Sequence, residues 1–485
     1  MTALTTLAAS VHLASVEAIL AAGALVVLML GSFRGDRSLV PLTWVAVGIM
    51  ALAGVHVMVV PEGGATAFGG LYIGDAFANF FKVLILGGAA VSAVLALPYL
   101  KESATARFEY PVLILLSALG MCMMVSANDL LTLYVGLELQ SLAAYVLAAF
   151  HRNEARSSEA GLKYFVLGAL ASGILLYGIS LVYGFTGTTS FAALHGLVRG
   201  TAGADIGVLI GLVFILSGLA FKIAAVPFHM WTPDVYEGAP TPVAAFFASA
   251  PKAAAMGLLL RVAVGAFGGM TLDWRQIVTF VSIASMLLGA VGAIGQSNIK
   301  RLLAYSSINN VGFALIGLAA ATREGVTAVL FYMAVYLVMT LGSFLCILQM
   351  RVPDGTPVET LASLSGLSRS RPGLAAAFAV FMFSLAGIPP LLGFWPKFAV
   401  FQAAVDAQLY ALAVVGVVAS VVGAYYYLRV IKSIYFDDPA PAFAPADSHT
   451  NTALIGVAAL FCSPLGMFAI TPLVAAAGHA ARALL

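Results

Sequence analysis

The sequence predicts an all-α polytopic membrane protein, and three observations support this fold class. Of the 485 residues, 62% are hydrophobic and only 9% are charged, and the mean hydropathy is +1.03. A soluble domain carries about 25% charged residues. Apolar runs of about 20 residues, long enough for a helix to cross a bilayer, follow one another along the chain. Two of these runs are interrupted by proline, which marks irregular backbone at membrane depth.

We expect about 14 transmembrane helices, so that both chain termini lie on the same side. The apolar runs cover residues 14–32, 40–60, 75–99, 109–126, 129–150, 157–184, 205–228, 240–266, 276–297, 300–320, 325–349, 374–402, 407–434 and 451–477.

The distribution of lysine and arginine predicts the orientation of these helices. If the first loop is cytoplasmic, fourteen basic residues lie at inner loops and helix ends, and four lie on the outer side. Cytoplasmic loops of membrane proteins carry the excess of Lys and Arg. Loops 151–163 and 350–372 should therefore face the cytoplasm, whereas loop 185–204 and both termini should lie on the periplasmic side.

Five basic residues remain within predicted spans. Lys82 and Arg261 lie about two turns from the outer ends of their helices, so we expect their side chains to extend to the lipid headgroups. Lys222, Lys252 and Lys397 lie deeper. Because a charge near the bilayer centre costs about 2.5–3.5 kcal/mol or more, such lysines indicate an ion pathway.

Among the acidic residues, Glu138 alone lies in the middle of a predicted span. A carboxylate at this depth either binds a proton or contacts a cation. Lys222 is the deep charge of a nearby span, so we expect the two side chains to approach within ion-pair distance or to share one water molecule. A purely structural ion pair is the alternative interpretation.

Two long apolar runs share one broken-helix motif. The first breaks at Pro227 and continues into an irregular polar turn at residues 229–242, and the second is interrupted by Gly387 and the pair Pro389–Pro390. Broken helices at corresponding positions of two halves are typical of transporters built from inverted repeats. We expect an N-terminal three-helix segment (1–108), two inverted five-helix repeats (109–268 and 269–436), and a C-terminal loop with the last helix (437–485).

A proton path needs groups that change charge, and a buried lysine becomes neutral more readily than an exposed one. Glu138, Lys222, Lys252 and Lys397 are the candidate proton-translocating residues. His229, Asp234 and Glu237 in the polar turn are read either as turn structure or as a cytoplasmic mouth. The link between Lys252 and Lys397 would use water and side-chain polar groups, with the weaker candidates Tyr305, Ser306, Ser307, Asn309, Tyr332 and Tyr336.

Three segments together resemble a known family: HMWTPDVYEGAPTPVAAFFASAPK (229–252), NIKRLLAYSSINNVGF (298–313) and GIPPLLGFWPKF (387–398). They are similar to the antiporter-like membrane subunits of respiratory complex I, the proton-pumping NADH-quinone oxidoreductase, and VYEGAPTP is typical of the subunit N group. The resemblance covers almost the whole chain. It implies that Glu138, Lys222, Lys252 and Lys397 are the charged residues of helices five, seven, eight and twelve.

The resemblance also implies partners and cofactors. Subunits M and K would be the neighbours in a bacterial inner membrane, and FMN, iron–sulfur clusters and quinone would belong to other subunits. The chain itself shows no cofactor or nucleic-acid motif, and its three cysteines lie in separate apolar segments without metal-site spacing. Two alternatives stay open: a subunit of an Mrp-type cation/proton antiporter, and a scaffold that only holds the membrane arm together.

Overall fold

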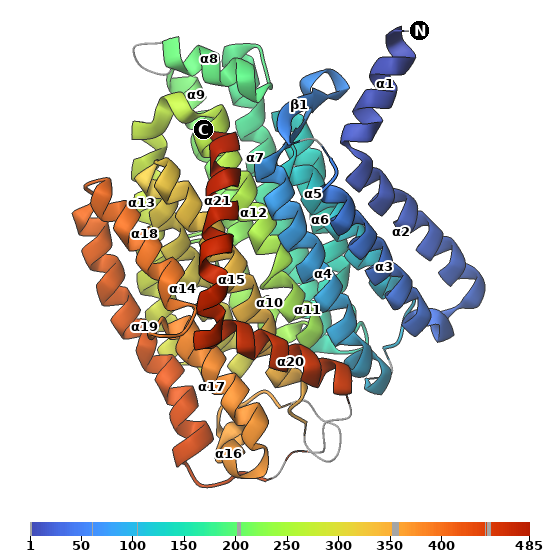
Figure 1. The fold of residues 1–485 in the computed structure, drawn as a ribbon, viewed down its shortest axis with the longest axis vertical. Coiled ribbons are helices and arrows are strands. Elements are labelled where there is room, and N and C mark those ends of the chain that lie inside the picture. The colour runs from blue at the N-terminus through green and yellow to red at the C-terminus, as the bar shows by residue number, and fades with distance from the viewer. Residues whose placement is uncertain are drawn as a thin grey trace.

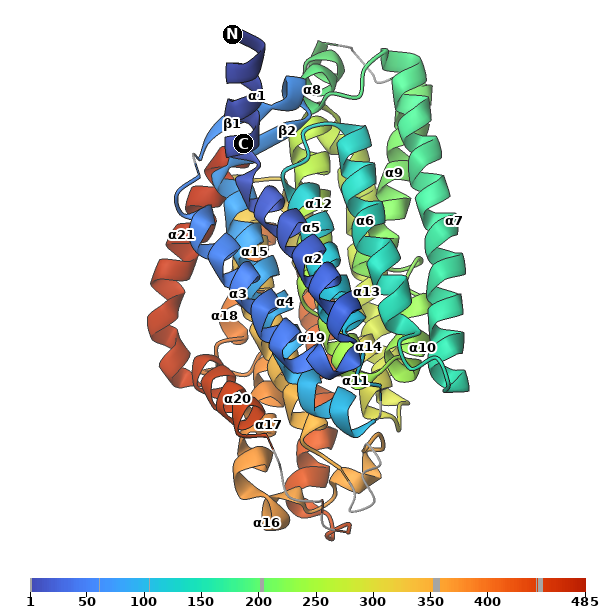
Figure 2. The same ribbon diagram turned by 90° about the vertical axis from the view of Figure 1, so that its right-hand side faces the viewer.

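The computed structural model describes residues 2–485 except 61, 104, 201–204, 352–357, 442 and 444–447. Long helices run side by side along one axis, and the two termini lie at the same end of this bundle (Figures 1 and 2). Among the described residues, twelve helices are long and apolar enough to cross a membrane. The protein is therefore a multi-pass membrane protein, as the composition predicts.

The N-terminal part forms one flank of the bundle and carries a short β-hairpin at the end where the termini lie (Figure 2). In the hairpin, β1 pairs with β2 in an antiparallel register. The elements are α1 (Thr2–Leu13), α2 (Ser15–Arg34), η1 (Asp36–Ser38), α3 (Leu39–Val57), β1 (Gly63–Ala67), η2 (Phe68–Gly70), β2 (Tyr72–Asp75) and α4 (Ala76–Glu102).

The next part contains the first broken helix. Its elements are α5 (Glu109–Val125), α6 (Leu130–Ala148), α7 (Ala155–Thr186), α8 (Phe191–Gly200), α9 (Ile206–Ile223), α10 (Trp231–Gly238), α11 (Thr241–Phe247), α12 (Ala250–Leu260), the π-helical η3 (Arg261–Ala266) and η4 (Gly268–Met270).

The remaining part contains the second broken helix, formed by α17 and α18. The elements are α13 (Thr271–Ile294), α14 (Ile299–Ala320), α15 (Arg323–Leu348), η5 (Ala362–Leu364), α16 (Leu367–Ser370), α17 (Pro372–Ala386), α18 (Phe394–Asp406), α19 (Tyr410–Phe436), α20 (His449–Cys462), η6 (Pro464–Ala469) and α21 (Ile470–Leu484).

Three helical segments form the centre of the bundle. The apolar window of Thr241–Ala266 is 100% buried, and those of Ile299–Ala320 and Arg323–Leu348 are 94% buried. The corresponding windows of α2, α7 and α19 are only 39% buried, so these helices present a large apolar surface to their surroundings. A charged residue in the middle of these segments, such as Lys252, therefore has no direct access to water or lipid headgroups.

The first break differs from its prediction in position and in form. Helix α9 ends at Ile223 and Ala224 adopts a left-handed backbone, so the break begins three residues before Pro227. Because the ring of a proline disfavours helical backbone at the preceding residue, a helix ends before it. The irregular turn expected at residues 229–242 is instead mostly the helix α10, and the expected span 240–266 is interrupted between α11 and α12.

The last predicted span, residues 451–477, is also divided. Helix α20 ends at Cys462, Ser463 is extended with φ −73° and ψ 176°, and Pro464 opens the segment that leads into α21. In Figure 1, α20 lies across the bundle whereas α21 runs along it. The single straight helix was therefore wrong, and the total of fourteen spans stays a prediction.

Candidate functional site

The three deep lysines share an environment that sets them apart from the other buried cations. Lys222, Lys252 and Lys397 are 7%, 1% and 6% exposed. Across the described ranges, none of the three has a carboxylate within 4.0 Å, whereas Lys82 (with Glu17), Arg261 (with Asp75) and Lys300 (with Glu359) each form an ion pair. The three lysines contact hydroxyls, carbonyls and aromatic rings instead, so they can lose a proton without leaving a buried carboxylate unpaired.

Glu138 and Lys222 lie in one polar patch between α6, α7 and α9, but they form no direct ion pair, which was one of the two expected arrangements. The Lys222 ammonium donates to Ser141 Oγ at 2.7 Å and to Tyr145 Oη at 3.4 Å. Ser172 of α7 donates to Glu138 Oε1. Hydroxyl groups therefore stand between the two charges, and the idea of a shared water stays a prediction.

Gly168 of α7 leaves the space that Tyr145 occupies. A Cβ atom at this glycine would lie 2.1 Å from Tyr145 Oη, whereas a Cβ at Gly173 on the same helix would meet nothing within 4 Å. Gly168→Ala should displace the tyrosine from Lys222 and destabilise the protein by about 1–3 kcal/mol. Proton pumping per assembled complex should fall, because the hydrogen bond to Lys222 is lost. Gly173→Ala is the matched control, and equal pumping by the two variants would contradict this interpretation.

Lys252 lies at the start of α12, directly after the interruption at Ser249. Its ammonium donates to Ser307 Oγ of α14, which also accepts a hydrogen bond from Tyr336 Oη of α15 at 2.6 Å. The ammonium also stands 5.5 Å from the centroid of the Tyr236 ring. Of the predicted path residues, Ser307 and Tyr336 thus surround Lys252.

A second polar cluster continues from this point between α14, α15 and α19. Tyr332 Oη donates to Asn310 Oδ1 at 2.7 Å, and the amide of Asn310 donates to Tyr427 Oη at 3.1 Å. Ser306 Oγ lies 2.5 Å from the same Tyr427 hydroxyl. The rings of Tyr332 and Tyr336 are stacked 6.5 Å apart, so the two clusters adjoin.

Sequence reasoning missed Asn310 and Tyr427 and included two residues that lie outside this cluster. Tyr305 packs against Gly292, and the Asn309 amide donates to the backbone carbonyl of Met286. The four-residue spacing of Ser306 and Asn310 on α14 was a usable signal, because residues at this spacing share a helix face.

Lys397 lies in α18 and reaches back to the end of α17. Its ammonium donates to the carbonyls of Leu385 and Ala386, both at 3.0 Å, and stands 4.6 Å from the Phe313 ring centroid. A cation at the C-terminal end of a helix is stabilised by the free carbonyls and the helix dipole. At the first break, Trp231 Nε1 donates to the freed carbonyl of Phe221, so Lys222 can point away toward α6.

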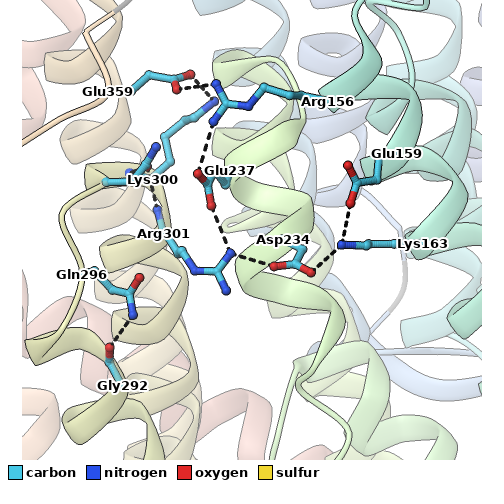
Figure 3. A network of polar contacts seen from close by, with 11 residues as sticks. Arg156, Glu159, Lys163, Asp234, Glu237, Gly292, Gln296, Lys300, Arg301 and Glu359 are labelled. Atoms are coloured by element: carbon cyan, nitrogen blue, oxygen red, sulfur yellow. Dashed lines mark hydrogen bonds and ion pairs between the residues drawn. The ribbon is translucent and has the colours of Figure 1, made fainter.

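Asp234 and Glu237 on α10 belong to an extended ion-pair network, shown in Figure 3. Asp234 pairs with Lys163 of α7 at 2.8 Å and Arg301 of α14 at 2.6 Å, and Glu237 pairs with Arg156 and Arg301. We call these residues, together with Glu159, Lys300 and Glu359, the inner-end network, because the charge distribution predicts that this end faces the cytoplasm. Arg156 also pairs with Glu359, so loops 151–163 and 358–372 lie at the same end of the bundle. His229 is half-buried, and its Nδ1 atom has no hydrogen-bond partner among the described residues.

Two carboxylates of the inner-end network remain ionised at neutral pH. Burial raises the pKa of Asp234, but hydrogen bonds from Lys163 and Arg301 and their charges outweigh burial and hold it below its usual range. Burial acts on Glu359 in the same way, and Lys300 and Arg156 lower its pKa below the usual range. Stability from a depressed carboxyl pKa is complete above the unfolded pKa and is lost only as pH falls through the folded one. The ion pairs of Asp234 and Glu359 are therefore retained between pH 6 and 8.

The expectation that Lys82 and Arg261 extend to the headgroups was wrong. Lys82 is 1% exposed and pairs with Glu17 at 2.9 Å, and it also donates to Tyr72 Oη at 2.7 Å. Arg261 binds both carboxylate oxygens of Asp75, at 2.8 and 2.9 Å. Each of these cations is stabilised by a buried carboxylate on a neighbouring element, so its side chain does not extend to the membrane surface.

The described residues contain no group of three or more His, Cys, Asp or Glu side chains that could hold a metal ion. The cysteines Cys122, Cys346 and Cys462 are buried and unpaired. The polar groups that surround Lys252 on the central helices are hydroxyls and amides, which donate and accept hydrogen bonds.

Comparisons with known proteins agree with this description. A family model described as NADH:quinone oxidoreductase/Mrp antiporter, transmembrane, matches residues 127–423. The chain is 63% identical to NADH-quinone oxidoreductase subunit N of Rhizorhabdus wittichii, over 98% of this chain and 99% of the relative. It is 55% identical to the subunit N of Parvibaculum lavamentivorans, over 97% and 96%. The chain belongs to the NADH:quinone oxidoreductase/Mrp antiporter family, within its group of NADH-quinone oxidoreductase subunits N.

Two solved structures show the same fold. A chain of respiratory complex I from Thermus thermophilus matches with TM-score 0.81 and 34% identity, over 94% of this chain and 98% of that one. A chain of the Mrp complex from Dietzia sp. DQ12-45-1b matches with TM-score 0.85 and 26% identity, over 97% of each. The fold is thus common to a chain of respiratory complex I and a chain of an Mrp complex.

Proposed function

We propose that this chain moves protons across the membrane as subunit N of an NADH-quinone oxidoreductase. The observation that carries the proposal is that three buried lysines have no carboxylate partner among the described residues, whereas the other buried cations there, Lys82, Arg261 and Lys300, each have one. A buried charge is costly, and an ion pair or hydrogen bonds reduce the cost. A buried lysine that contacts only hydroxyls, carbonyls and aromatic rings can gain or lose a proton more easily than a lysine held in an ion pair.

The proposed route follows the polar groups from Glu138 and Lys222 to Lys252, and from there to Lys397. Lys252 contacts Ser307 and Tyr336, and the neighbouring Tyr332, Asn310 and Tyr427 extend the row through the central helices. Each hydroxyl group both donates and accepts a hydrogen bond. A hydroxyl that takes up a proton from one neighbour can therefore release its own proton to the next neighbour. The Phe313 ring of α14 contacts the Lys397 ammonium at 4.6 Å and would act as an apolar gate on this last step.

Other subunits would supply the redox chemistry. FMN, iron–sulfur clusters and quinone belong to them in this proposal, and electron transfer there would drive changes of charge in this chain. Both helix breaks reach the surface, where Met230, Pro389 and Pro390 are exposed. Subunits M and K are the proposed neighbours that would cover such surfaces.

We also propose that residues 109–268 and 269–436 are inverted repeats. Helices α9 and α17 end alike, since the residues that follow them, Ala224 and Gly387, have φ angles of +61° and +83°. In each case a lysine whose ammonium lies in the buried core is nearby. This likeness supports a common origin of the two breaks.

The proposed orientation places both termini on the periplasmic side of a bacterial inner membrane. Cysteine labelling of intact cells tests it at two exposed positions, because the native cysteines are buried. Ser158→Cys lies at the end that holds the inner-end network, and Ala193→Cys lies in α8 at the opposite end (Figure 1). An impermeant maleimide should label position 193 and not position 158 in intact cells, and both in permeabilised cells. The reverse pattern would overturn the orientation.

The alternative function is a subunit of an Mrp-type cation/proton antiporter, which the fold likeness to the Dietzia complex favours. The higher identity to the Thermus complex I chain and to subunits N favours the redox-driven function. Purification of the tagged chain from its native membrane decides between them. Co-purification of flavin, iron–sulfur clusters and NADH-quinone activity is expected, and a complex without them would support the antiporter.

A further inference from the structure

The second helix break leaves the last four backbone carbonyls of α17 without partners inside that helix, as at any helix end. Two of them, those of Phe383 and Ser384, accept hydrogen bonds from backbone N–H groups that directly follow the helix. The other two, those of Leu385 and Ala386, accept hydrogen bonds from the Lys397 ammonium. Lys397 therefore binds the end of a helix other than its own, and its contacts depend on how α18 is placed against α17.

Two consecutive N–H groups of the break, just before α18, bind groups on other helices. The backbone N–H of Leu392 donates to the carbonyl of Cys462 at the end of α20, at 3.1 Å. The backbone N–H of Gly393 donates to Ser384 Oγ of α17, at 3.0 Å. The start of α18 is thus tied to α20 by one hydrogen bond and to α17 by the other.

Ser384 is completely buried, and its hydroxyl is used fully. The hydroxyl accepts the hydrogen bond from Gly393 and donates one to Met339 Sδ of α15 at 3.1 Å. The backbones also pack closely here, because a Cβ atom at Gly393 would clash with the Ser384 carbonyl and would lie 2.8 Å from Met339 Sδ. The end of α17 and the start of α18 are therefore in direct contact at Ser384.

This contact lies one helical turn before Lys397, because four residues separate Gly393 from the lysine. The lysine side chain runs back past Gly387, where a Cβ atom would lie 2.8 Å from Lys397 Cδ. Its ammonium binds both carbonyls at 3.0 Å. A shift of α18 by about 1 Å away from α17 would carry the ammonium beyond hydrogen-bond distance of both.

We propose that Ser384 is a positioning residue for Lys397, because its hydroxyl holds α18 where the ammonium reaches both free carbonyls of α17. The inference rests on the proposed proton-translocating function. Among the described residues, the ammonium contacts these carbonyls and the Phe313 ring. A buried charge without hydrogen-bond acceptors is costly, so loss of the two carbonyls makes proton uptake by Lys397 less favourable. Ser384 itself gains and loses no proton.

Ser384→Ala removes the acceptor of the Gly393 N–H, and the hydrogen bond between Leu392 and Cys462 remains, so the complex should still assemble. Proton pumping per assembled complex, measured in inside-out vesicles, should fall about tenfold. This is less than the loss of about 10² typical for removal of a proton-transfer group, because Lys397 is still present. Ser384→Thr keeps the hydroxyl and should recover most of the rate.

Ser343→Ala is the matched control. Ser343 of α15 is as fully buried as Ser384, but its hydroxyl donates to the Met339 carbonyl of its own helix at 2.8 Å. Its removal therefore leaves no N–H group of a helix break without an acceptor. Ser343→Ala vesicles should pump at the parental rate, and a tenfold loss there would mean that any buried serine in this region has the same effect, which would overturn the proposal.

Lys397→Ala, measured in parallel, shows whether Ser384 acts through the lysine. Its pumping should fall about 10²-fold, and addition of Ser384→Ala should lower the residual rate no further. Parental pumping by Ser384→Ala, threonine as slow as alanine, or a further loss in the double variant would overturn the positioning role. Normal pumping by Lys397→Ala contradicts the proposed proton path, whereas loss with Lys397→Ala but not with Ser384→Ala contradicts only the positioning role.

Discussion

Lys252→Ala should assemble normally and lose most quinone-linked NADH oxidation and proton pumping together. Assembly is expected to survive because Lys252 has no carboxylate partner among the described residues, so its removal leaves no buried acid unpaired. Loss of a positioned proton-transfer group costs about 10²-fold or more in rate. Oxidation should fall with pumping, because transport and the redox step are coupled through the shared membrane arm.

Two further variants sharpen this prediction. Lys252→Arg should recover at most part of the activity, because a guanidinium does not release its proton at accessible pH. Lys101→Ala is the control for the substitution itself, since Lys101 is exposed at the end of α4. Equal oxidation rates for Lys101→Ala and Lys252→Ala, at equal complex content, would exclude a special role of Lys252.

Arg261→Ala should cause the largest loss of stability, about 3–5 kcal/mol, because it leaves Asp75 as an unpaired buried carboxylate. The side chains of Asp75 and Arg261 are 1% and 5% exposed, and their two hydrogen bonds join the start of α4 to η3. Thermal release of this subunit from the purified complex measures the loss. The double substitution Asp75→Asn with Arg261→Met should cost less than Arg261→Ala alone, because Asn keeps the α4 cap without a buried charge.

Arg107→Ala is the matched control for this prediction. Arg107 forms an ion pair with Asp36 at 2.5 Å, but the two side chains are 51% and 38% exposed. An exposed pair contributes about 0–1 kcal/mol. If Arg261→Ala is no more destabilising than Arg107→Ala, the buried pair does not hold α4 against the central helices.

The rare charges and prolines in apolar segments made the main features predictable from the sequence. Lys222, Lys252 and Lys397 are buried in the centre, and both helix breaks occur within a few residues of the prolines that indicated them. In each case the residue type alone was enough for the prediction. A charge or a missing backbone N–H group in an apolar helix has a high free-energy cost, so it occurs only at special positions.

Contacts between distant segments were not predictable in this way. Arg261 and its partner Asp75 are 186 residues apart, and nothing local at Arg261 indicates a buried acid. Tyr427 is one of three consecutive tyrosines, of which Tyr425 is exposed, so helix periodicity did not single it out. The break between α11 and α12 lacks the proline pair that marks the second break, but Pro251 lies in the first turn of α12, so the rule applied at Pro227 would have indicated this break as well.

Acidification of inside-out membrane vesicles tests the central claim most directly, because it records proton movement and NADH oxidation in the same sample. Vesicles with Lys252→Ala and normal complex content should show acidification and oxidation that both fall far below the parental values, while Lys101→Ala vesicles match the parent. If Lys252→Ala vesicles pump at the parental rate and the parental proton-to-electron ratio, Lys252 does not lie on the proton path.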